Sequence, residues 1–145
     1  MKLFFLILLT ISVLFANDLP VKNQDVSPEQ LKKQNKQIVQ LVATELSKDL
    51  PKTVDKYTVF TNIIAKDSNL EYTFEINTGV KSDETVRNED KTRMREAVTY
   101  GVCKSSKRFM DAQITIIYNY ISAKTKADLF NFKINQDICF KLMGK

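Results

Sequence analysis

Histidine and tryptophan are absent from the 145 residues, which include only two Cys, three Gly and three Pro. Without histidine, the protein lacks the most common metal ligand and the only side chain that titrates near neutral pH without perturbation. Two cysteines alone cannot build a tetrahedral structural zinc site. With so few glycines, the sequence contains no Gly-rich phosphate-binding loop. We therefore expect neither a metal ion nor a cofactor.

The same absences limit catalysis. No serine stands in a Gly-x-Ser-x-Gly motif, and no histidine could activate one. A pair between Ser105 or Ser106 and a neighbouring lysine lacks the Ser-x-x-Lys spacing that places both groups on one helical turn. Glu71 and Glu75 would lie about 13 Å apart along a strand, beyond the roughly 5 to 9.5 Å between glycosidase carboxylates. We predict no enzyme activity, and a small envelope hydrolase using such groups is the alternative.

The N-terminus has the pattern of an export signal. Met1-Lys2 is followed by the apolar run 3–15 and then by Ala16 before a polar segment, which is typical of a secretory signal peptide with its cleavage site. A helical run of this length spans about 20 Å, less than the roughly 30 Å of a hydrocarbon core. We therefore predict a signal peptide over 1–16, with an uncleaved anchor as the alternative. The protein is expected to be periplasmic or secreted, with no stable membrane span after cleavage.

The two cysteines fit an exported protein. Cys103 and Cys139 form an even pair in a short chain destined for an oxidising compartment, which favours one disulfide over a metal site or a reactive thiol. A redox-active pair is the alternative, but the two residues lack Cys-x-x-Cys spacing. In the chain-entropy model, such a bridge stabilises the fold by about 3 to 4 kcal/mol.

The mature chain begins with a polar segment, 17–26, which we expect to be flexible. Ser27 to Gln30 then forms a helix start, with a serine N-cap, a proline in the first turn and a glutamine to close the capping box. Apolar residues at steps of four and seven follow on one face as far as Leu50, and Pro51 is expected to end the helix. We predict that 27–145 is a single α+β domain.

After this helix, the hydrophobic period changes to two. Alternation over 57–66 and 69–77, with a turn between them, predicts a β-hairpin. A second helix is expected from Ser82 or Asp83 to about Cys103, and a second hairpin lies within 114–134. The predicted fold is helix-hairpin-helix-hairpin, with a four-stranded, mainly antiparallel sheet, helices on one face and one disulfide.

The strands are rich in aromatic residues that share a face with aliphatic side chains. That arrangement predicts core packing rather than a stacking platform for sugars or single-stranded nucleic acid. The hydroxyl groups of Tyr72, Tyr118 or Tyr120 could still line a small pocket at the rim of this face. The aromatic residues concerned are Tyr57, Phe60, Tyr72, Phe74, Tyr118, Tyr120, Phe130 and Phe132.

Basic residues gather in the second predicted helix and just after it. Acidic residues are interspersed among them and the formal net charge is only +5, so an ordinary charged helix face is favoured over an anion-binding surface. Nucleic acid is not expected as a ligand of an exported protein. If a partner binds here, the face consists of Arg87, Lys91, Arg93, Arg95, Lys107 and Arg108.

The sequence also resembles a loose group of small secreted bacterial proteins without an assigned function. The resemblance rests on the run from Leu50-Pro51 to Thr58, on Tyr72-x-Phe74 and Tyr118-x-Tyr120, and on Cys103 and Cys139. It implies a periplasmic location and the same disulfide, and it carries over no catalytic or binding residue.

These observations together predict a non-catalytic binding or accessory protein of the bacterial envelope. A protein partner would be engaged through the basic face or through an exposed sheet edge. A carrier of a small apolar ligand, with a pocket between helices and sheet, is a further alternative.

Overall fold

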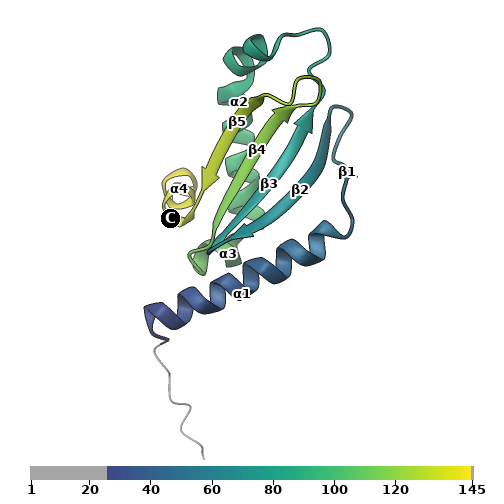
Figure 1. Ribbon diagram of the computed structural model, residues 1–145. Helices are drawn as coiled ribbons and strands as arrows, with labels where there is room; N and C mark the ends of the chain where they lie inside the picture. The colour runs from purple at the N-terminus through teal and green to yellow at the C-terminus, as the bar shows by residue number, and fades with distance from the viewer. Residues whose placement is uncertain (1–25, 145) are drawn as a thin grey trace, which may run out of the picture.

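The computed structural model describes residues 26–144. The predicted signal peptide, 1–16, and all but the last residue of the predicted flexible segment, 17–26, lie outside the described residues. Figure 1 shows α1 running across one end of a twisted sheet and α2 along the sheet. The elements are α1 (Pro28–Ser47), β1 (Lys52–Thr53), β2 (Thr58–Lys66), β3 (Asn69–Ile76), α2 (Asp83–Ser105), α3 (Lys107–Asp111), β4 (Thr115–Ser122), β5 (Asp128–Ile134) and α4 (Gln136–Met143).

The sheet has five strands in the order β1-β2-β3-β4-β5. Its neighbours pair antiparallel except β3 and β4, which are parallel. The prediction of a four-stranded, mainly antiparallel sheet is therefore wrong, since a fifth strand is present and the sheet is mixed. The two expected hairpins are β2–β3 and β4–β5, but α2 carries the chain back between them as a crossover, so that the two central strands run in the same direction.

Local signals in the sequence explain where the helices begin. At the start of α1, Ser27 and Gln30 form the expected capping box, with hydrogen bonds of 3.0 and 3.2 Å. Ser82 caps α2 through Thr85. The sequence did not predict α3 or α4, and α4 is capped by Asn135. These two helices are too short, at five and eight residues, to show a clear helical period.

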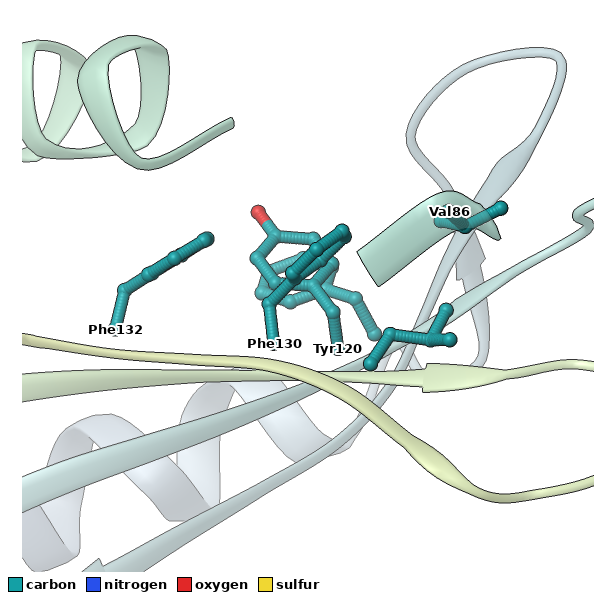
Figure 2. Close-up of a cluster of buried hydrophobic side chains, with 6 residues drawn as sticks. Val86, Tyr120, Phe130 and Phe132 are labelled. Atoms are coloured by element: carbon teal, nitrogen blue, oxygen red, sulfur yellow. The ribbon is translucent and has the colours of Figure 1, made fainter. Parts of the chain in front are cut away.

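Both long helices cover the same face of the sheet, and three clusters of buried side chains fill the space between. The first cluster joins Phe74 and Tyr120 to Val86 of α2, and Figure 2 shows Tyr120, Phe130 and Phe132 rising from the strands on this face. The second surrounds the two cysteines. The third places Val39 of α1 against β2 and β3. Helix α1 is thus anchored on the third cluster, and α2 on the first and second.

Candidate functional site

The disulfide is present as predicted. Cys103 of α2 and Cys139 of α4 are bonded, with a Cα–Cα distance of 5.3 Å and a sequence separation of 36. Both residues are buried and pack with neighbours that include Ile116 and Ile134. The bond fastens the C-terminal helix to the end of α2. It therefore has a structural setting rather than that of an accessible thiol pair.

Three of the groups considered for catalysis are engaged in local contacts. The Ser105 hydroxyl donates to the Gly101 carbonyl at 2.8 Å, and Lys107 pairs with Asp111 at 2.7 Å. The Glu75 carboxylate accepts from Lys126 at 2.8 Å. Within residues 26–144, no group of three or more Cys, Asp or Glu side chains could hold a metal ion.

The six residues of the predicted basic face are divided between two helices. Arg87, Lys91 and Arg95 follow one another at steps of four along α2, whereas Arg93 lies about 200° around the helix from Lys91. Arg93 is paired with Asp90 at 2.7 Å. The Arg87 side chain is partly buried and donates to the carbonyl of Asp128 at 2.9 Å. The remaining two, Lys107 and Arg108, belong to α3.

Aromatic rings form a continuous band across the helix-covered face. The register aligns Tyr72 with Tyr118 and Phe74 with Tyr120, so that rings on neighbouring strands meet. Phe60 continues the band onto β2, with its ring centroid 5.5 Å from that of Tyr72. The Tyr72 and Tyr118 centroids are 5.0 Å apart. The band reaches β5 through Tyr120, Phe130 and Phe132.

The middle of this band is not fully covered. Phe60, Tyr72 and Tyr118 are only partly buried, although Phe74 and Tyr120 beside them are buried. Tyr72 packs against all three buried clusters, Phe60 against the first and third, and Tyr118 against the first and second. We call Phe60, Tyr72 and Tyr118 the aromatic junction. It lies where the three clusters meet and where neither long helix completely shields the sheet.

Partly buried apolar side chains from three helices surround the aromatic junction. They pack against the same clusters and share its intermediate exposure, so the apolar surface extends beyond the three rings. These side chains are Ile38 and Val42 of α1, Met94 and Val98 of α2, and Phe109 of α3.

The tyrosine hydroxyls at the aromatic junction are hydrogen-bond donors. Burial raises the pKa of Tyr72 to about 12, with a smaller contribution from neighbouring Tyr118, and burial also raises the pKa of Tyr118. Both groups therefore keep their protons at neutral pH. A protonated tyrosine hydroxyl can both donate and accept a hydrogen bond.

Sequence reasoning found only part of this site. The core role is confirmed for Phe74, Tyr120, Phe130 and Phe132, which are buried. The hydroxyls of Tyr72 and Tyr118 were predicted at the rim of this face, but the partial exposure of the rings was not, because alternation shows which face a residue is on but not whether a helix lies above it. Tyr57 lies outside the core and is exposed.

No helix in the described part of the chain combines the length and the apolar character needed to cross a membrane.

No protein-family model and no curated protein matches the sequence. The fold is similar to that of a protein from Pseudomonas aeruginosa described as secreted, with a TM-score of 0.66, 14% identity, and 75% of this chain and 96% of that chain covered. It is also similar to the type 2 secretion system pilotin EpsS from Vibrio vulnificus (TM-score 0.61, 13% identity, 77% and 96% covered). The type II secretion system pilotin AspS from Vibrio cholerae gives a TM-score of 0.59 at 16% identity, with 77% and 97% covered. The chain thus shares its fold with one bacterial protein described as secreted and with two secretion-system pilotins.

Proposed function

We propose that this protein is a non-catalytic accessory protein of the bacterial envelope that binds an apolar segment of a protein partner on the aromatic junction. The observation that carries the proposal is the incomplete burial of Phe60, Tyr72 and Tyr118 at the meeting point of three otherwise buried clusters. Neighbouring apolar side chains that stay partly exposed on one surface are typical of an interaction site.

The chemistry of the aromatic junction suits a protein ligand. Tyrosine gives a large apolar area at a low cost in conformational entropy, and its hydroxyl fixes the orientation of the ligand. Aromatic residues set in a largely desolvated surface are the usual centres of binding energy in protein interfaces. The Tyr72 and Tyr118 hydroxyls would each donate to an acceptor on the partner, such as a backbone carbonyl.

An envelope location is supported by the N-terminal pattern over 1–16 and by the disulfide between Cys103 and Cys139. The similarity of the fold to a protein described as secreted and to two secretion-system pilotins agrees with it. We accordingly propose that the protein is exported and acts in the periplasm or outside the cell.

A crosslinked pull-down from envelope extract tests the proposal. We expect the unaltered protein to recover a defined partner, and Tyr118→Ser to lose it while remaining folded by circular dichroism. Tyr57→Ser is the matched control, because Tyr57 is exposed and lies outside the aromatic junction; it should recover the partner at full yield. Equal recovery by Tyr118→Ser would count against the aromatic junction as the binding surface.

A carrier of small apolar ligands is the second candidate, favoured by the same partly buried rings. A fluorescent apolar probe separates the two functions. A carrier would bind the probe tightly at one site, and Tyr118→Ser would abolish that binding without any protein partner being present.

A further inference from the structure

The outer edge of β2 is only partly paired. β1 has two residues, and these face Val59 and Phe60 at the beginning of β2. A bulge follows between Phe60 and Asn62. From Asn62 to Lys66, no strand of the described chain lies beyond β2. An edge of this kind leaves backbone hydrogen-bonding groups without a partner in the sheet.

The register shows which backbone groups face outward. Asp67 and Ser68 form a two-residue turn between the paired residues Lys66 and Asn69. In such a hairpin, the pair beside the turn is hydrogen-bonded and the direction of the backbone groups alternates along the strand. The N–H and C=O groups of Ile63 and Ala65 therefore point away from β3, toward the place of a next strand.

Helix α1 provides a second, independent observation. Leu46 lies on the same side of α1 as Val39 and Ala43, which are 0% and 8% exposed beneath the sheet, yet Leu46 is 40% exposed. Figure 1 shows α1 continuing past the edge of β2. On the other face of the sheet, Ile64 at this edge is 46% exposed. An added strand would cover aliphatic groups on both faces.

From these observations, we infer that the edge of β2 from Asn62 to Lys66 accepts an extended segment of a partner protein as a sixth strand. Ile63 and Ala65 would exchange backbone hydrogen bonds with it, and its alternate residues would contact Leu46 on one face and Ile64 on the other. This surface is separate from the aromatic junction and does not depend on it.

A second copy of the chain is a less suitable occupant. The free edge is five residues long, about 17 Å. Pairing along so short an edge would bury less than the roughly 800 Å² per partner of a standard stable interface. A flexible extended segment of a partner can also bury area against side chains beside the edge, so it does not depend on the edge alone.

The test is an NMR titration of the isotope-labelled protein with the heptapeptide Thr-Val-Thr-Val-Thr-Val-Thr. We expect the amide signals of Ile63 and Ala65 to shift and their exchange with solvent to slow. The same peptide with N-methylated backbone groups cannot form the ladder and should cause neither change. Ala65→Pro removes an outward-facing N–H at a position where an edge strand tolerates proline, and it should weaken binding about fivefold or more.

Three results would overturn the inference. The first is the absence of any shift at millimolar peptide. The second is peptide binding at another place, shown by shifts confined to the aromatic junction or by an affinity that Ala65→Pro leaves unchanged. The third is a dilution series in which the unaltered protein dissociates from a dimer with loss of protection at Ile63 and Ala65, because a second copy would then occupy the edge.

Discussion

The aromatic junction lies on the same face of the sheet as the second cluster, which surrounds Cys103 and Cys139 and which we call the disulfide cluster, but the two regions differ in how they are covered. Ile116, two residues before Tyr118 on β4, is 2% exposed under the crossover helix and the C-terminal helix, whereas Tyr118 is only partly buried. The difference comes from the placement of the helices. An apolar strand residue contributes to stability where a helix closes over it, and it remains available to a partner where none does.

The largest expected effect is on the disulfide cluster. Cys139→Ser opens a bridge with a sequence separation of 36 and should lower the free energy of unfolding by about 3 to 4 kcal/mol in the chain-entropy model. Urea unfolding under oxidising conditions measures the loss. If the two regions have separate roles, partner recovery at low temperature should be unchanged in this variant. A loss below about 1 kcal/mol would contradict the structural role of the bridge.

A pair of substitutions on β4 sharpens the comparison. Ile116→Ala removes a fully buried side chain and should cost about 2 to 4 kcal/mol in the free energy of unfolding. Tyr118→Ser, at a partly buried position, should cost about 1 to 2 kcal/mol. Thermal and urea unfolding of the two variants test this order. The reverse order would mean that the aromatic junction is part of the structural core.

High pH provides a milder way to disturb the aromatic junction. Tyr72 has a pKa near 12 in the folded protein, against 10.0 as the ordinary value. Because the unfolded chain loses this proton first, the stability that the neutral hydroxyl contributes is complete below pH 10 and declines as the pH rises from 10 to 12. Urea midpoints across this range should fall, and less steeply in Tyr72→Phe. Identical slopes would contradict the partial burial of Tyr72.

The smallest effect is expected at the surface of α2. Arg93 is well exposed and pairs with Asp90 across one turn, so Arg93→Gln should change the free energy of unfolding by less than about 0.5 kcal/mol. Partner recovery should also be unaffected. A clear loss of recovery with this variant would indicate that the partner binds the predicted basic face and not the aromatic junction.

Much of the local structure could be predicted from sequence because its causes are local. The capping box at Ser27, the two hairpins and the disulfide follow from residue types and spacing alone. The parallel pairing of β3 with β4 depends on which strands of two separate hairpins become neighbours. Packing between segments that are distant in the sequence determines this pairing, and the hydrophobic periodicity of the strands does not show it.

The candidate site was harder to predict for the same reason. The sequence identified the aromatic face and the tyrosine hydroxyls at its rim, but Phe60, Tyr72 and Tyr118 differ from Phe74 and Tyr120 only in what lies above them. The residues of the predicted basic face are not all one or two helical turns apart, and two of the six belong to another helix. Charge counts along a chain do not carry this information.

The most direct test of the central claim is the affinity of the recovered partner for Tyr118→Ser compared with Ile116→Val, measured at a temperature where both variants are folded. Ile116→Val should cost about 0.5 to 1.5 kcal/mol in stability, similar to Tyr118→Ser, but it alters only buried contacts. We predict that Tyr118→Ser weakens binding at least about tenfold while Ile116→Val leaves it unchanged. Equal weakening by both variants, or none by Tyr118→Ser, would contradict the assignment of the aromatic junction as the binding surface.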